Sequence, residues 1–145
     1  MDIINSRDGI KCTISVKLQI RYYYITCGLH IDASLDNSVK TPEHGGEGVW
    51  EDRCAMELFP NSFVTLDWEG DCELSSGGKR AGINVKPDAT LVLKGTHQGT
   101  LTGTCWNNQN GVYTEGAGIG GDSTNPNFGT IIIESGDIVG RCFAQ

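Results

Sequence analysis

A segment of this chain is repeated without gaps at an offset of 27 residues, and the repeat constrains the fold more than any other feature. Residues 54–67 align on residues 81–94, which places Pro60 opposite Pro87 and aliphatic residues opposite one another at alternate positions. A third copy occupies residues 117–133, where the offset from the second copy grows from 36 to 40. Repeats of this length are typical of solenoids, in which one unit cannot bury its apolar row alone and stacks on the next.

Each copy has the residue chemistry of short strands separated by turns. In the second copy, aliphatic and β-branched residues gather at 83–85, 90–94 and 99–103, bounded by Gly, Pro and Asp. No window of about eleven residues keeps apolar positions at helical spacing, so helices should be scarce. The pattern predicts an all-β chain folded as a short right-handed parallel β-helix, since parallel crossovers are almost always right-handed. An antiparallel sandwich is the alternative, although it does not require a gapless repeat with matched prolines.

The N-terminal part lies outside the repeat and is predicted to close the first coil. Residues 12–20 alternate strictly between apolar and other residues, which is typical of one long half-buried strand. The apolar face of this strand consists of Ile14, Val16, Leu18 and Ile20. We expect residues 1–24 to form an N-terminal capping strand and residues 25–145 to form the coils, because an uncapped coil exposes unpaired edges. Residues 36–51 are predicted to be an insertion loop, and such loops often carry function.

The charge of the chain argues against one class of function. Lys and Arg number 11 against 18 Asp and Glu, which gives a formal net charge of −7. Without a concentrated basic patch no surface neutralises phosphates, so nucleic acid is not an expected partner. No stretch approaches the ~20 apolar residues of a membrane-spanning helix, and residues 1–17 lack the apolar core of a signal peptide. We therefore expect no membrane insertion, and any export signal would lie outside this chain.

Six cysteines are spread along the chain without a C-x-x-C pair, which gives no support to a zinc ribbon or a thioredoxin-type site. The segment that ends at Cys105 aligns on the segment that ends at Cys142, so these two residues are predicted to lie opposite each other on adjacent coils. Stacked strands are about 4.8 Å apart, which a disulfide can span. A stack of free buried thiols is the alternative, and we favour it. Cys72 aligns with Gly99 and is expected to lie outside the stack.

The repeats also resemble a known class of sequence. The Gly/Thr-rich segments that carry the resemblance are residues 81–95, 99–103, 116–121 and 129–136. They resemble repeats of large surface proteins from anaerobic gut bacteria, often labelled carbohydrate-binding or β-helix repeats, over roughly residues 49–142. The resemblance implies a parallel β-helix and an extracellular or cell-surface setting. It transfers no catalytic residue, because the matching positions are inward aliphatic residues and turn glycines.

The most distinctive polar segment is residues 106–115, an insertion that the first copy lacks. A flat aromatic ring flanked by amides and a carboxylate suits a sugar, whose apolar face stacks on the ring while its hydroxyls bond to the amides. The residues predicted to bind a ligand are Trp106, Asn107, Asn108, Asn110, Tyr113 and Glu115. The alternative is a solvated turn in which Trp106 covers the edge of a coil.

Other acidic and amide residues suggest weaker hypotheses. Asp122, Asn125 and Asn127 could line a loop for a hard cation, although only one carboxylate is present and no metal is predicted. Carboxylate pairs could catalyse acid–base cleavage of a polysaccharide, but spacing singles out no pair. The candidates are Asp52, Asp67, Glu69, Asp71, Glu115 and Asp137. The cluster at residues 67–71 is expected to be a solvated turn with a partly exposed Trp68.

Together these observations predict a non-catalytic surface module, with a glycan or a surface protein as its partner and no cofactor. A structural spacer or fibre segment of a larger surface or virion protein is one alternative. A polysaccharide hydrolase or lyase is the other, and it would need a groove lined by at least two of the carboxylates.

Overall fold

The computed structural model describes residues 2–5, 14–16, 20–26, 28–32, 54–76, 80–105, 116–122 and 125–142. These residues form strands and turns without a helix, which confirms the predicted all-β class. The described part of the chain accordingly holds no helix that is long and apolar enough to cross a membrane.

The strands pair in three sheets, in which every pairing is parallel. Sheet A has the order β1-β3-β6-β9-β12, sheet B has β13-β10-β7-β4 and sheet C has β11-β8-β5-β2. The strands are β1 (Asp2–Asn5), β2 (Ile14–Val16), β3 (Ile20–Thr26), β4 (Leu29–Asp32), β5 (Met56–Leu58), β6 (Phe63–Trp68), β7 (Cys72–Ser76), β8 (Ile83–Val85), β9 (Thr90–Lys94), β10 (Thr100–Cys105), β11 (Ile119–Gly120), β12 (Thr130–Ser135) and β13 (Asp137–Cys142).

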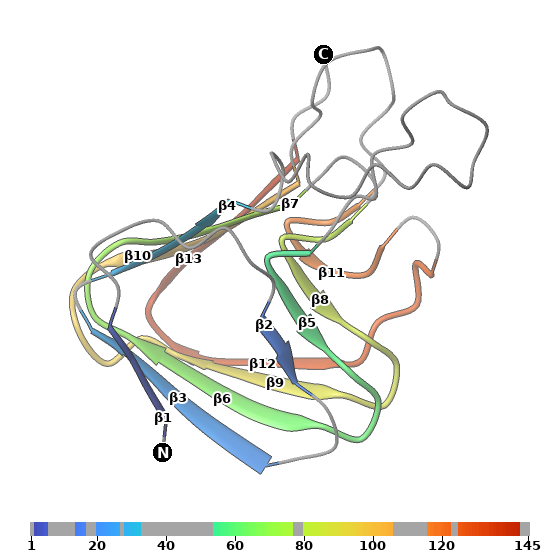
Figure 1. Cartoon of the computed structure of the whole chain (residues 1–145), viewed down its shortest axis with the longest axis horizontal. Coiled ribbons are helices and arrows are strands. Elements are labelled where there is room, and N and C mark those ends of the chain that lie inside the picture. Colours follow the sequence, from blue (N-terminus) through green and yellow to red (C-terminus); the bar gives the residue numbers. More distant parts are fainter. Residues whose placement is uncertain are drawn as a thin grey trace, which may run out of the picture.

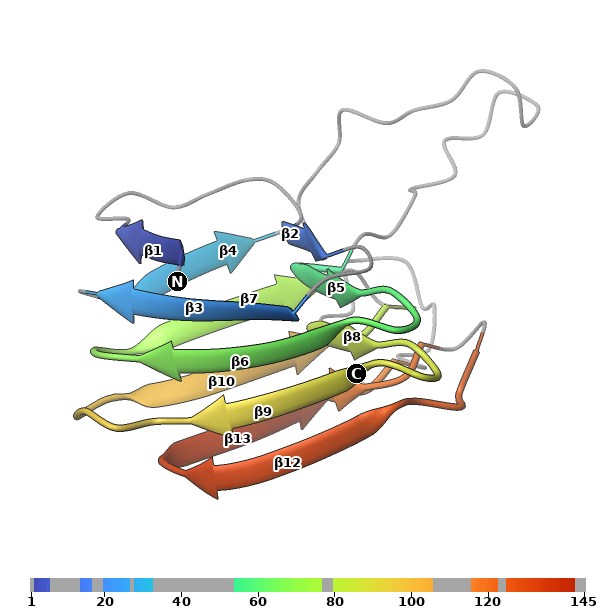
Figure 2. The same cartoon turned by 90° about the horizontal axis from the view of Figure 1, so that it is seen from below.

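From β2 onward, the described chain visits sheets C, A and B in the same order four times. We call each passage a unit: unit 1 is β2–β4, unit 2 is β5–β7, unit 3 is β8–β10 and unit 4 is β11–β13. Figure 1 shows the three sheets surrounding a common interior, and Figure 2 shows β3, β6, β9 and β12 lying on one another. Among the described strands each sheet is open, with β1 and β12 at the two edges of sheet A.

The predicted repeat is confirmed in sheets A and C. Met56 pairs with Ile83 and Phe63 pairs with Thr90, both at an offset of 27 residues. The third copy follows with Ile83 opposite Ile119. Because these residues stand in register, their side chains fall on the same face of a sheet, and the apolar rows stack from unit to unit.

The register of sheet B differs from the prediction for unit 2. Cys72 pairs with Leu101, two residues beyond the expected Gly99. The reason is loop length: five residues, 95–99, join β9 to β10, whereas three residues, 69–71, join β6 to β7. Cys105 does pair with Cys142 as predicted. No disulfide joins them, and Cys105 is buried whereas Cys142 is exposed.

The N-terminal region differs from the single strand that alternation suggested. β2 pairs with β5 in sheet C, whereas β3 pairs with β6 in sheet A, so the chain changes sheet between Val16 and Ile20. Ile20 is 84 % exposed rather than inward, because it stands beside the outward Phe63. The predicted boundary after residue 24 falls inside β3, and β1 forms the edge of sheet A beside it. The predicted insertion loop, residues 36–51, lies outside the described residues.

The core lies between the sheets and is built from their inward rows. Fully buried examples are Ile25, Leu66, Leu93, Leu74, Leu101, Met56 and Ile83. Trp68 is also fully buried, and its Nε1 donates a hydrogen bond to the Gly99 carbonyl at 3.1 Å. The expectation of a partly exposed Trp68 was wrong, because β6 continues to this residue and its alternation turns the ring inward. A side chain at Gly95 would collide with the Trp68 ring, since its Cβ would stand 2.5 Å from Cζ2.

Candidate functional site

The residues predicted to bind a ligand lie in segment 106–115, outside the described residues. The structure does place the two ends of this segment, at Cys105 and Gly116. The other predicted loop follows Asp32 at the end of β4. Asp32 and Thr104 both pair with Ser75, so the two segments leave from strands on either side of β7, about 10 Å apart.

The predicted carboxylates fall in different places. Asp52 and Glu115 lie outside the described residues. Asp67 lies near the end of β6 and Glu69 begins the following turn, where they meet side chains from units 1 and 3. Asp71 accepts a hydrogen bond from the backbone of Thr100 at 2.9 Å, and Asp137 pairs with Thr100 in sheet B.

Asp67 lies at the centre of a hydrogen-bonded cluster that spans three units. Its outward-facing carboxylate is nevertheless only 4 % exposed. Tyr22, on β3, donates its hydroxyl hydrogen to Oδ2 at 2.8 Å. Thr96, in the loop after β9, donates its backbone N–H to Oδ1 at 3.1 Å and its hydroxyl to the same oxygen at 2.8 Å. The carboxylate therefore holds the five-residue loop, which is two residues longer than its counterpart in unit 2, against sheet A.

These contacts determine the protonation states of the cluster. Burial acts to raise the pKa of Asp67, but the hydrogen bonds from Tyr22 and Thr96 outweigh it, and the pKa lies below its usual value. The same hydrogen bond to the carboxylate raises the pKa of Tyr22. Asp67 is thus ionised at neutral pH and accepts hydrogen bonds only.

His97 extends the cluster toward solvent. Its Nδ1 lies 2.9 Å from Thr96 Oγ1. Because Thr96 has one hydroxyl hydrogen and gives it to Asp67, the neutral imidazole must carry its hydrogen on Nδ1 and donate it to Thr96. This assignment, inferred from the network, leaves Nε2 of the exposed His97 as a hydrogen-bond acceptor.

Tyr24 completes an exposed surface next to His97. The two rings are tilted at 49° with centroids 5.5 Å apart. The Tyr24 hydroxyl donates to Glu69 Oε2 at 3.1 Å and lies 3.5 Å from His97 Nδ1. His97 also lines an open depression of about 710 Å³ together with Thr96, Gln98, Gly99, Gly136 and Asp137. We call Tyr24, Glu69, His97 and Gln98 the turn-edge site, because all four lie where sheet A turns into sheet B.

A second depression, of about 360 Å³, lies on the outer face of sheet B. It is lined by His30, Asp71, Cys72, Glu73, Thr100, Thr102 and Arg141. His30 Nδ1 stands 3.5 Å from Glu73 Oε2. Burial raises the pKa of the Cys72 thiol to about 11, so this residue is a poor nucleophile at neutral pH.

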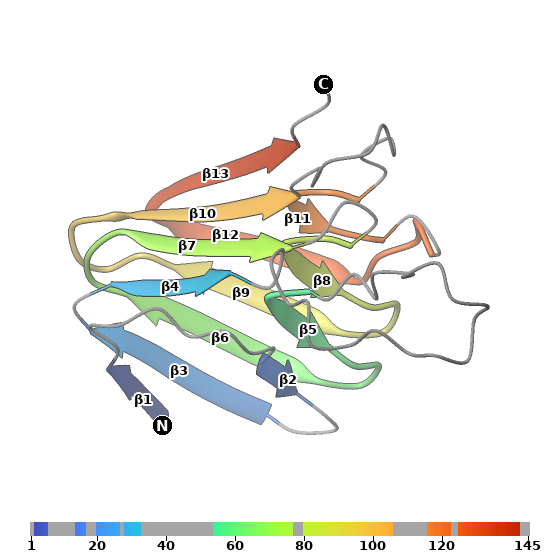
Figure 3. The ribbon, with the colours of Figure 1, turned by 45° about the horizontal axis from the view of Figure 1, so that its top comes forward.

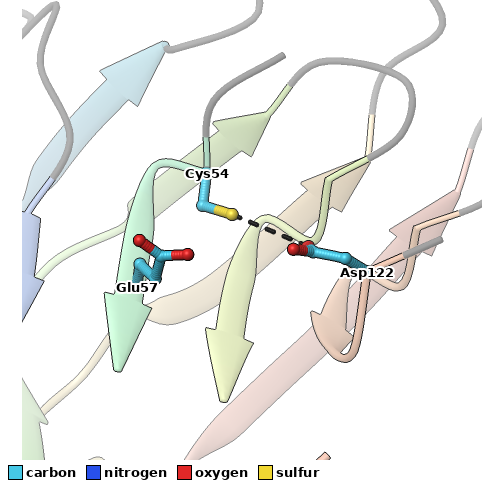
Figure 4. Close-up of side chains that lie close together, drawn as sticks. All are labelled: Cys54, Glu57 and Asp122. Carbon is cyan, nitrogen blue, oxygen red and sulfur yellow. Dashed lines mark hydrogen bonds between the residues drawn. The ribbon is translucent and has the colours of Figure 1, made fainter. Parts of the chain in front are cut away.

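Three potential metal ligands also meet on the outer face of sheet C, because Glu57 alternates with the inward Met56 and Leu58. The ligand atoms of Cys54, Glu57 and Asp122 lie within 4.8 Å of one another, and Figure 4 shows their side chains converging. Asp122 is 4 % exposed. It already forms an ion pair with Arg80 Nη1 at 2.7 Å and accepts a hydrogen bond from Asn84 Nδ2 at 2.7 Å. The positive charge that a metal would supply is therefore present in Arg80.

The remaining contacts of this cluster support a structural role. The backbone N–H of Ala81 donates to Asp122 at 2.9 Å, and the Cys54 thiol lies 3.7 Å from the same oxygen. Burial, followed by the charge of Asp122, raises the pKa of Cys54, which keeps the thiol protonated. Asp122 is buried against Arg80 and Asn84, whereas Asn125 and Asn127 are exposed, so the suggested cation loop keeps only two of its three side chains.

The sequence did contain a signal for the turn-edge site. Tyr22 and Tyr24 alternate with Tyr23, which packs against the core, so two of the three tyrosines face outward. Comparing residues 69–71 with residues 95–99 would have revealed the two extra residues that bring Thr96 and His97 to Asp67. What the sequence could not give was the pairing of these segments across units.

Comparison of the chain with models of protein families, with curated proteins and with solved structures finds no match.

Proposed function

We propose that the chain is a short right-handed parallel β-helix that acts as a non-catalytic surface module and binds a glycan at the turn-edge site. The fourfold passage through sheets C, A and B supports the β-helix, since each unit stacks its apolar row on the next. Right-handedness rests on the general preference of parallel crossovers. The extracellular or cell-surface setting rests on the resemblance of the repeats to those of gut-bacterial surface proteins.

The observation that carries the glycan proposal is the pairing of an aromatic ring with fixed acceptors at an open depression. The rings of Tyr24 and His97 offer faces on which a sugar can stack. Glu69 and Nε2 of His97 accept hydrogen bonds from hydroxyls, and Gln98 both donates and accepts. All three polar residues are exposed, so a sugar reaches them without opening the fold.

The hydrogen-bond network beneath the site fixes the position and the tautomer of His97. Asp67 fixes Thr96, and Thr96 in turn fixes the tautomer of His97. Positioning of this kind lowers the conformational entropy that binding would otherwise cost. The residues of the turn-edge site come from units 1, 2 and 3. This arrangement suits an extended chain of sugars whose successive rings lie over successive units.

Other readings have weaker support. A spacer or fibre segment needs only the stacked units and gives no reason for an exposed site with fixed acceptors. A hydrolase or lyase needs a groove lined by at least two of the candidate carboxylates, whereas one of the two depressions described above is lined by Asp71 and the other by Asp137. A surface protein as partner remains an alternative occupant of the same site.

Glycan-array screening followed by calorimetric titration of the best-binding oligosaccharide tests the proposal. His97→Ala and Tyr24→Ala are expected to weaken binding about tenfold or more, since each removes a stacking ring or an acceptor. His30→Ala is the matched control, because it removes an exposed histidine on sheet B and should leave the affinity unchanged. Absence of any oligosaccharide binding, or equal affinity of all three variants, contradicts the proposal. Release of reducing ends from a bound polysaccharide would instead identify an enzyme.

A further inference from the structure

Unit 4 presents an open end of the core. Leu93 in β9 is fully buried, whereas Ile133, its register partner in β12, is 61 % exposed. Cys105 is buried and its partner Cys142 is exposed. Among the described strands, β13 pairs with β10 alone and therefore forms an edge of sheet B, where a further strand can pair. Figure 3 shows β13 at the edge of sheet B beside β10.

The charged residues of β13 are placed so that two antiparallel copies of the strand bring opposite charges together. In an antiparallel pair centred on Val139, Asp137 of one copy stands opposite Arg141 of the second copy, and the reverse holds as well. These side chains share the outer face of sheet B, because Ile138 between them is in register with the buried Leu101. Residues directly opposite in an antiparallel pair have neighbouring side chains, and opposite charges there attract. Two such ion pairs form in one contact.

The inward side of this pairing is complementary in size. Ile138 of one copy stands opposite Gly140 of the second. A Cβ built on Gly140 would meet only the Ile119 nitrogen, at 3.8 Å, so space is open there. At Gly103, the register partner of Gly140 one unit further in, a Cβ would lie 2.5 Å from the Gly118 carbonyl oxygen. The described residues therefore leave space beside Gly140 that they do not leave beside Gly103.

We propose that two copies of this chain associate through β13, antiparallel about a twofold axis at Val139. The pairing extends sheet B across both copies and covers part of the exposed end. It is isologous and closed, so it gives dimers and not fibres. One strand pair buries a small interface, and we expect a dissociation constant on the order of 10 µM.

Sedimentation velocity over a range of protein concentrations tests the proposal. The wild-type chain should pass from the 15.6 kDa monomer to a dimer. Asp137→Arg and Arg141→Asp should each weaken dimerisation about tenfold or more, because each places like charges opposite one another. An equimolar mixture of the two variants should recover a dimer, since one copy then presents two arginines and the other two aspartates. The double variant should dimerise with itself.

Glu134→Arg is the matched control. It reverses a charge on β12 at the same end of the molecule, outside the proposed pairing, and should leave dimerisation unchanged. Circular dichroism of each variant checks that the strands are retained. A wild-type chain that stays monomeric overturns the proposal, as does a mixture of the two single variants that fails to associate. Polymers larger than dimers would show that a different, open contact operates at this end.

Discussion

Asp67 and Asp122 are buried carboxylates, and each is held by donors that lie far away in the sequence. Asp67 binds Tyr22 from unit 1 and Thr96 from unit 3, while Asp122 binds Arg80 at 2.7 Å across sheet C. Burying a charge without partners costs several kcal/mol, so each site is stable only when the surrounding segments are in place. A residue of this kind reports on the correct stacking of three segments at once.

The stability that Asp67 contributes should depend on pH. Its pKa is lowered in the fold, so the contribution is full above the unfolded value near 3.8 and is lost as the pH falls through the folded value. Asp67→Asn should reduce the free energy of unfolding by about 1–3 kcal/mol at neutral pH and by less in acid. Urea unfolding of the wild-type chain and of the variant, at neutral pH and in acid, measures the two differences. Glu134→Gln, at an exposed position, is the control; an equal loss for Asp67→Asn at both pH values contradicts the prediction.

Gly99 should tolerate substitution far less well than Gly140. Its φ of 128° disfavours other residues, and a Cβ there would lie 2.3 Å from the Gly70 carbonyl. Gly99→Ala should cost more than about 2 kcal/mol, whereas Gly140→Ala should change stability by less than about 0.5 kcal/mol. Thermal unfolding at low protein concentration measures both. Similar melting temperatures for the two variants would show that the loop after β9 adapts more freely than its contacts indicate.

At the scale of elements, the registers show how far sequence reasoning reaches. The matched prolines place Met56 opposite Ile83 correctly, because the strands and turns around them are equal in length. The register of Cys72 was missed by two residues, because extending the offset of 27 residues into sheet B assumes that the loops before β7 and β10 are equally long. The alternation that ends at Ile20 likewise cannot distinguish one strand from two strands joined at a corner. The turn-edge site depends on these same loops and was missed for that reason.

Sheet C has the shortest strands, and the Asp122 cluster should supply much of its stability. β11 has only two residues, so its ladder with β8 is short. Asp122→Ala leaves the buried Ala81 N–H and Asn84 amide without their acceptor and removes the ion pair with Arg80, so it should cost about 2 kcal/mol or more. Glu134→Ala breaks an exposed pair with Lys94, at 3.8 Å, and should cost less than about 1 kcal/mol. Denaturant unfolding of both variants measures the difference, and equal losses would show that the buried cluster adds nothing.

For the whole molecule, stacked units imply that stability comes from contacts between neighbours and that the two ends need separate protection. The ends differ in the structure. β1 lies against β3 at the edge of sheet A, whereas unit 4 exposes Ile133 and Phe128. A chain of this design is therefore expected to be monomeric only when both ends are covered or blocked.

Deleting residues 1–19 should expose the N-terminal end and cause aggregation. The deletion removes β1 and β2, which leaves the edges of β3 and β5 unpaired, and unpaired strand edges template association. Made in the Arg141→Asp background, the deletion separates this effect from pairing through β13, since that variant blocks the other end. Light scattering after size-exclusion chromatography should then find insoluble protein or species larger than a dimer, while full-length Arg141→Asp stays monomeric. A truncated variant that remains monomeric with unchanged melting would mean that β3 and β4 close the stack without β1 and β2.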